Sequence, residues 1–406
     1  MKVTPYVSYG TICYDISPLI TITDGQIFLN TINSTTIDTT TTSNVDKDEV
    51  FVLPEPVSNN VLKFINSAKN SLDIYVYQLY YNDIETALLN KANEGIKIRI
   101  IIPWQSTKNF KLPININTLK KKTNNIKVMI SPNTFYNSHC KYMIADNKKA
   151  MIMDFNFEKS YFTRVRGFGF ITENKNDIED LVNVFENDFV NLSKSSQRMV
   201  SFKYNSPRLV WCPNSLVYRE ADPVNHPSNK NGLMKIYDFI EESTCTLDIY
   251  SFVLKDESII GKLINTAKSK NVKIRIIFNT SIPSLTFSLT QLERMISSGI
   301  SFKYYFYNND FNSEEPSPNY FMHSKSMVSD NSKVYIGSTN INLSSIYANR
   351  ELGIIINDKD IVNTISNTFK NDWRSSYANQ IQYKDGKIVD PFNMSRSPTN
   401  DLMNRF

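Results

Sequence analysis

The feature that most constrains the fold of this chain is an internal duplication. The segment Leu72–Tyr75 returns as Leu247–Tyr250. Three later pairs are all separated by one and the same number of residues, slightly larger than the number between those two segments. The pairs are His139 and His323, Asn156 and Asn340, and Asp188 and Asp372. Because this motif spacing stays constant over about fifty residues, the chain is predicted to contain two copies of one unit.

Each copy begins with helical and strand-like patterns in alternation. In the first copy, an amphipathic helix is predicted over residues 61–68 and a strand over 72–77. A second helix over 84–94 would end at Gly95, before a β-branched strand over 96–102. We therefore predict an α/β fold of two duplicated units, with mixed or mainly parallel sheets flanked by helices and a pseudo-twofold relation between the halves.

Changes in composition divide the chain into four parts. Residues 1–49 are predicted to be a β-rich N-terminal segment with a threonine-rich linker, and residues 381–406 a polar tail. The two halves are expected at residues 50–200 and 201–380. Their connection should lie near residues 193–206, which show no clear helical stripe.

The composition is that of a globular protein. Of its 406 residues, 41% are hydrophobic, and 45 basic against 40 acidic residues leave a net charge of +5, which does not establish a polyanionic partner. No run of about 18 apolar residues occurs, so a cytoplasmic or peripheral membrane location is favoured. Four scattered cysteines, without a C-x-x-C pair, are expected to be ordinary thiols: Cys13, Cys140, Cys212 and Cys245.

Two of the three histidines open the same motif, His-x-Lys-x-x-x-x-Asp. The first copy begins at His139 and the second at His323. Chance would produce this repeat with odds on the order of one in a few thousand, which outweighs the usual interpretation of a histidine as a core or surface residue. The third histidine, His226, lies beside prolines and is predicted to be a loop residue.

The motifs place their charged groups in a defined way. Apolar residues after each lysine predict a strand, whose alternation directs His and Lys to the same face. Asp146 and Asp330 precede Asn-containing turns, so their carboxylates can anchor the motif, although a role confined to shaping the turn is an alternative.

The second copy continues with Gly337, Ser338 and Asn340, and Glu351 follows. This pattern, H-x-K-x4-D-x6-G-S-x-N, resembles the phospholipase D superfamily, and the resemblance covers about residues 50–373. The first copy departs from it, with Asp154 preceding Asn156 and with Gly167 in the place of Glu351. Because an acidic residue in this region orients a catalytic imidazole in the family, one histidine is expected to need Asp154 or another carboxylate as a substitute.

The resemblance implies a mechanism through a phosphohistidine. His139 is expected to attack phosphorus and His323 to protonate the leaving oxygen, without a metal ion or cofactor. The irregular first copy leaves open that these two roles are reversed. The predicted catalytic residues are His139, Lys141, Asp146, His323, Lys325 and Asp330. The predicted substrate-binding residues are Asn156, Ser338, Asn340 and Glu351.

Three functions fit this resemblance. The leading prediction is a phosphodiesterase that hydrolyses or transfers a phosphatidyl group, with a phospholipid substrate and peripheral membrane contact. The alternatives are a metal-independent nuclease acting on DNA or RNA, and a non-catalytic membrane-associated protein that keeps the fold. An apolar rim would favour lipid, and a basic groove with stacking aromatics would favour nucleic acid. A monomer is expected, because a duplicated chain can complete its own site.

Overall fold

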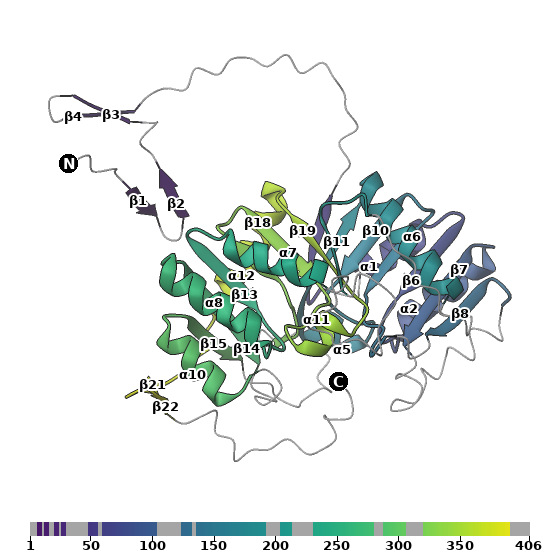
Figure 1. Ribbon diagram of the computed structural model, residues 1–406. Helices are drawn as coiled ribbons and strands as arrows, with labels where there is room; N and C mark the ends of the chain where they lie inside the picture. The colour runs from purple at the N-terminus through teal and green to yellow at the C-terminus, as the bar shows by residue number, and fades with distance from the viewer. Residues whose placement is uncertain are drawn as a thin grey trace.

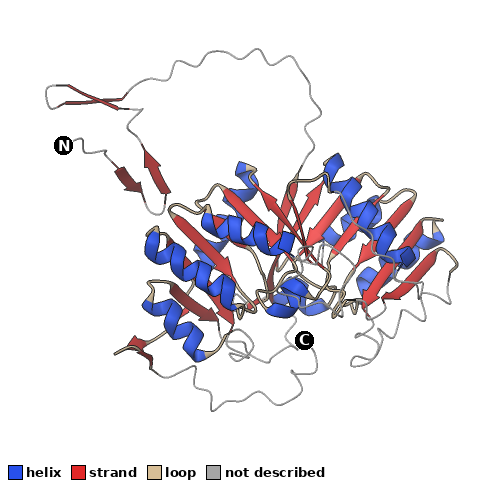
Figure 2. Ribbon diagram, viewed as in Figure 1, coloured by secondary structure: helices blue, strands red, loops and turns tan. Residues whose placement is uncertain are grey.

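The computed structural model describes residues 48–55, 59–103, 123–131, 135–191, 204–212, 230–279, 287–305 and 320–389, together with the backbone of four short strands before them. These residues form two eight-stranded mixed sheets that lie side by side and are flanked by helices (Figures 1 and 2). The predicted α/β class with two duplicated units is confirmed.

The first half contains most of one sheet and four helices among its described residues. Its sheet has the order β16-β11-β10-β9-β6-β7-β8, with β5 beside β11. Strands β6, β7 and β8 are parallel, whereas β9, β10 and β11 are antiparallel. The elements are β5 (Glu49–Leu53), α1 (Asn59–Ser67), β6 (Ser71–Tyr75), α2 (Asn82–Asn93), β7 (Lys97–Pro103), β8 (Ile126–Ser131), β9 (Tyr142–Ala145), β10 (Lys149–Met153), α5 (Lys159–Arg164), β11 (Val165–Thr172) and α6 (Lys175–Asn191).

The second half repeats this order in the sheet β12-β19-β18-β17-β13-β14-β15-β20. Its strand β16 (Phe321–Met322) leaves that sheet and pairs with β11 of the first half. The other elements are β12 (Leu209–Cys212), α7 (Lys230–Glu241), β13 (Thr246–Tyr250), α8 (Glu257–Ser269), β14 (Lys273–Asn279), α10 (Leu289–Ser297), β15 (Ser301–Tyr305), β17 (Met327–Ser329), β18 (Lys333–Gly337), α11 (Leu343–Tyr347), β19 (Glu351–Ile356), α12 (Lys359–Arg374) and β20 (Asn379–Gln380).

The ends of the chain carry small hairpins. The pairs β1 (Tyr6–Tyr9) with β2 (Ile12–Asp15) and β3 (Ile20–Thr23) with β4 (Gln26–Leu29) agree with a β-rich N-terminal segment. The threonine-rich stretch and His226 lie outside the described residues. In the predicted polar tail, β21 (Tyr383–Lys384) pairs with β22 (Lys387–Ile388). The four domain boundaries remain predictions.

Local sequence explains the strands and their connections. The β-branched run of β7 is buried at nearly every position, as expected for a parallel strand covered on both faces. Gly95, predicted to end α2, has φ +94°, a conformation that costs glycine no Cβ clash. Cys140 and Cys212 are buried free thiols, whereas Cys245 is disulfide-bonded, so the expectation of an ordinary thiol is wrong at Cys245.

The two halves share an apolar interface. Strands β10 and β11 lie against β18 and β19, and one hydrophobic cluster contains α6 residues of the first half and α12 residues of the second (Figure 1). Burying such a surface favours a single packed body. Within the described part of the chain, no helix has the length and apolarity needed to cross a membrane.

Two buried ion pairs cross this interface reciprocally. Arg166 of the first half contacts Asp372 of the second at 2.7 Å, and Arg350 of the second half contacts Asp188 of the first at 2.9 Å. Both the arginines and the aspartates are related by the same motif spacing as the two histidines. The ion pairs therefore follow the pseudo-twofold relation of the halves.

Candidate active site

Each motif histidine is held against the other half of the protein. Ser138 forms a parallel bridge with Arg350, and the His139 amide donates to the Arg350 carbonyl at 2.8 Å. Reciprocally, β16, which precedes His323, pairs with the start of β11 at Arg166. Because the arginines are followed by Glu351 and Gly167, these two positions lie beside the histidine of the opposite half.

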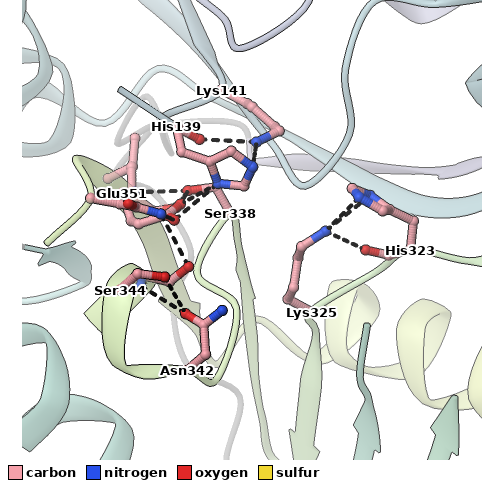
Figure 3. A network of polar contacts seen from close by, with 11 residues as sticks. His139, Lys141, His323, Lys325, Ser338, Asn342, Ser344 and Glu351 are labelled. Carbon is pink, nitrogen blue, oxygen red and sulfur yellow. Dashed lines mark hydrogen bonds and ion pairs between the residues drawn. The ribbon is translucent and has the colours of Figure 1, made fainter. Parts of the chain in front are cut away.

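His139 is oriented by a carboxylate from the second half (Figure 3). Its Nδ1 donates to Glu351 Oε2 at 2.8 Å, and Lys141 Nζ donates to its Nε2 at 3.0 Å. Burial lowers the pKa of His139 to about 4; Glu351 opposes this effect and Lys141 adds to it. The ring is therefore neutral at pH 7, with its Nε2 lone pair directed at a cation.

His323 has different neighbours. Lys325 Nζ lies 2.9 Å from its Nδ1 and 3.2 Å from its Nε2 (Figure 3). The Tyr161 hydroxyl lies 3.4 Å from Nε2. Burial lowers the pKa of His323 well below its usual value, and Lys325 and Lys141 lower it further by charge repulsion. The predicted convergence of His and Lys is confirmed in both motifs, although the strands β9 and β17 begin after each lysine.

The motif aspartates anchor backbone at the far end of β9 and β17. Asp146 accepts hydrogen bonds from the amides of residues 69–71 at 2.6–2.9 Å, and Asp330 accepts three from residues 244–246 at 2.8 Å. Burial opposes the charge of Asp146, but the amides hold its pKa below the usual value. Both aspartates have positive φ in the predicted turns. Both carboxylates therefore bind backbone amides, and their assignment as catalytic residues remains a prediction.

Glu351 and Ser338, predicted to bind substrate, form a buried network behind His139. Ser338 Oγ donates to Glu351 Oε2 at 2.5 Å, and Asn349 Nδ2 donates to Glu351 Oε1 at 3.0 Å. Glu351 is fully buried. Two hydrogen bonds and the imidazole therefore hold the carboxylate against His139, while its contact with substrate remains a prediction.

The two predicted asparagines keep unused acceptors. Asn156 Nδ2 donates to Gln78 Oε1 at 2.8 Å and lies 3.3 Å from the Tyr161 hydroxyl. Among the described residues, the Oδ1 atoms of Asn156 and Asn340 are buried without a hydrogen-bond partner. A buried polar atom left in this state costs free energy, which a donor on a bound molecule would recover.

Sequence reasoning missed two aromatic residues that pack on the motifs. Tyr77 lies edge-on to His139 with ring centroids 4.8 Å apart, and Phe252 packs on His323 at 4.6 Å. The same rings lie under Lys141 and Lys325, at 5.6 and 5.2 Å. Their signal was available, because each aromatic residue follows its copy of the repeated strand at the same position.

The buried site is arranged to receive an anion. Lys141 and Lys325 both approach it without solvent exposure, and burial lowers the pKa of Lys141 to about 8. Two lysine ammonium groups that meet at one place can hold the oxygens of a phosphodiester by charge-assisted hydrogen bonds. Among the described residues, no group of three or more His, Cys, Asp or Glu side chains forms a potential metal site.

Comparisons with known proteins agree with this arrangement. The chain matches the family described as "Cardiolipin synthase, PLD-like domain" over residues 61–189 and 236–373. It is 22% identical to a cardiolipin synthase of Oceanobacillus iheyensis over 348 residues, which cover 81% of this chain and 69% of the relative. It is 28% identical to the virion nicking-joining enzyme of Vaccinia virus (strain Western Reserve) over 146 residues, covering 34% and 32% of the two chains.

A solved structure supports the same fold. Phosphatidylserine synthase of Haemophilus influenzae Rd KW20 superposes with a TM-score of 0.61 at 10% identity, over 82% of this chain and 87% of that one. With the two-segment family match and the paired His-Lys motifs, the protein is a duplicated phospholipase D-like protein. The chain belongs to the phospholipase D superfamily.

Proposed function

We propose that this protein is a phosphatidyltransferase or phospholipase of the phospholipase D superfamily, acting through a phosphohistidine. The observation that carries the proposal is the asymmetric pair of imidazoles, one oriented by Glu351 and both paired with a buried lysine. The lipid substrate is favoured because the likeness to a cardiolipin synthase covers 81% of this chain. Peripheral contact with a membrane follows as part of this proposal.

The geometry favours His139 as the nucleophile. When the bound phosphate accepts the hydrogen bond of Lys141, the Nε2 lone pair of His139 becomes free. Attack of Nε2 then forms a P–N bond and breaks the P–O bond to the leaving group, which takes a proton from His323. Positive charge then develops on the His139 ring, where Glu351 stabilises it through Nδ1. In the second step, His323 accepts the proton of water or an alcohol, whose oxygen attacks phosphorus and releases His139.

His323 can act as an acid only when the negative charge of a bound substrate raises its pKa. In the free enzyme, burial and the two lysines lower the pKa of His323. A phosphodiester anion bound between Lys141 and Lys325 offsets their repulsion and raises this pKa toward neutrality. Protonation of His323 is therefore coupled to substrate binding.

A nuclease is the second candidate. It is favoured by the likeness to the virion nicking-joining enzyme, which covers only 34% of this chain. The non-catalytic alternative is disfavoured because both His-Lys pairs and the Glu351 network are complete. A monomer remains the expectation, since one chain supplies both motifs.

The first test is turnover in excess EDTA on vesicles of phosphatidylglycerol or phosphatidylcholine, on single-stranded DNA and on a generic phosphodiester. We expect metal-independent release of a lipid headgroup, or its exchange with an alcohol, and loss of turnover in His139→Ala and His323→Ala. His226→Ala is the matched control and should retain activity. Preferential cleavage of DNA would replace the lipid proposal with the nuclease, and inactivity on all four substrates would contradict both.

The pH dependence should follow the groups of the free enzyme. Attack requires neutral His139, so kcat/KM should fall as the pH drops through about 4, the pKa of His139. The reaction also requires a proton on His323, whose pKa in the free enzyme lies well below its usual value, so kcat/KM should already decline as the pH rises above that pKa. Anion binding requires charged lysines, so the fall should become steeper as the pH rises through about 8, the pKa of Lys141. Lys325, whose pKa burial also lowers, acts in the same direction. A profile measured in EDTA that rises steadily beyond pH 9 would contradict this assignment.

A further inference from the structure

The two halves carry an acidic side chain at different positions of the same pair of neighbouring strands. In the second half, Ser338 follows β18 and Glu351 begins β19. At the corresponding positions of the first half, given by the motif spacing, Asp154 follows β10 and Gly167 lies in β11. The second half thus has its acidic residue at the start of β19, whereas the first half has it at the end of β10, the strand beside β11.

Gly167 makes the room that Asp154 occupies. A Cβ at Gly167 would lie 2.7 Å from Asp154 Oδ1, closer than such contacts occur. That oxygen accepts a hydrogen bond from the Phe168 amide at 2.8 Å, whereas in the second half the equivalent amide of Leu352 donates to Ser338 Oγ at 3.1 Å. Asp154 thus uses the backbone donor of its serine counterpart and carries a charge as well.

The second oxygen of Asp154 reaches the other motif. Oδ2 accepts from Ser324 Oγ at 2.6 Å and lies 3.4 Å from Ser326 Oγ, and all three side chains are buried. These serines flank Lys325, and in extended backbone they lie on the face opposite His323 and Lys325. The first motif has Cys140 and Tyr142 at these positions. The motif that contacts Asp154 thus has two serine hydroxyls where the other motif has a thiol and a phenol.

Charge links Asp154 to Lys325. Burial and Lys141 lower the pKa of Lys325, whereas Asp154 and Glu351 act to raise it. Burial raises the pKa of Asp154 to about 6, while Ser324 and Lys325 favour its charged form. Lys325 and Ser324 thus favour the ionised form of Asp154, and that negative charge in turn favours the protonated form of Lys325.

We infer that Asp154 is the positioning carboxylate of the second motif: it holds the backbone that carries His323 through Ser324 and supports the charge of Lys325, in place of a glutamate at Gly167. This inference rests on the proposed phosphodiester chemistry. The two histidines are then positioned differently: His139 through its ring, and His323 through its backbone and Lys325.

Binding of sulfate, whose charge is constant across the pH range used, tests the inference without turnover. Calorimetric titrations of wild type, Asp154→Asn and Asp180→Asn should be compared between pH 6 and 10. Asp180 is the matched control, because it is equally buried and accepts amide hydrogen bonds from residues 205 and 206. In Asp154→Asn, sulfate affinity should fall with a midpoint about one pH unit lower than in the other two proteins.

A second test measures activity after the carboxylate is placed on the neighbouring strand. Asp154→Ser should lower kcat about tenfold or more, and Asp154→Ser with Gly167→Glu should recover most of the loss, because the carboxylate then stands where Glu351 stands for His139. An unshifted sulfate midpoint in Asp154→Asn, absence of sulfate binding in wild type, or a double variant no better than Asp154→Ser would overturn the inference. Inactive wild type with a shifted sulfate midpoint would instead contradict the proposed function alone.

Discussion

Replacement of His139 by alanine is expected to lower kcat by about 10⁴-fold or more, the largest effect on activity of any single substitution proposed for this protein. The reason is that the residue supplies the atom that bonds to phosphorus, and Glu351 orients that atom through Nδ1. Steady-state turnover of the preferred substrate in EDTA measures the effect. His323→Ala should also abolish transfer, but should preserve attack on a substrate with a leaving group that needs no proton, such as a p-nitrophenyl phosphodiester.

Glu351→Gln separates orientation from nucleophilicity. It keeps the shape and most hydrogen bonds of a side chain that is fully buried, but removes the charge next to His139. We expect kcat to fall about 10²-fold to 10⁴-fold with little change in KM, because the lost interaction strengthens only as the imidazole becomes positive. A variant of His139 that retains a tenth of wild-type turnover, or Glu351→Gln with wild-type kcat, would exclude His139 as the nucleophile.

Replacement of Arg350 by methionine is expected to lower the free energy of unfolding by about 3–5 kcal/mol. Arg350 and Asp188 have side chains that are 0% exposed, so the substitution leaves a carboxylate buried without its cation. The guanidinium also lies over the rings of Phe135 and Trp211, at 5.1 and 5.4 Å. The lost pair joins the two halves beside Glu351, so the catalytic network should loosen as well.

Urea unfolding followed by circular dichroism measures this loss. Lys262→Met is the matched control, because it removes a cation from an ion pair with Glu241, whose side chain is 52% exposed. That pair should contribute about 0–1 kcal/mol. Adding Asp188→Asn to Arg350→Met should recover part of the stability, since it removes the uncompensated charge. A loss in Arg350→Met no larger than in Lys262→Met would mean that the buried pair does not hold the halves together.

Much of the fold could be predicted because its signals are local. The helix before β6, the buried run of β7 and the φ of Gly95 follow from side-chain periodicity and backbone sterics over a few residues. The cysteine prediction failed at Cys245, which is disulfide-bonded, because a sequence alone does not show which thiols form a disulfide. The roles of Asp146 and Asp330 were half predicted: the turn was visible, but the amides that their carboxylates bind come from other segments.

By itself, the sequence determined that the chain is duplicated, that each half pairs a histidine with a lysine, and that the first copy departs from the second at Asp154 and Gly167. Only the tertiary structure decided which carboxylate serves which histidine. Glu351 reaches His139 from the opposite half because the halves pack reciprocally, and Asp154 turns to Ser324 for the same reason. Spacing along a chain records the local repeat, whereas contacts between repeats depend on how their surfaces pack.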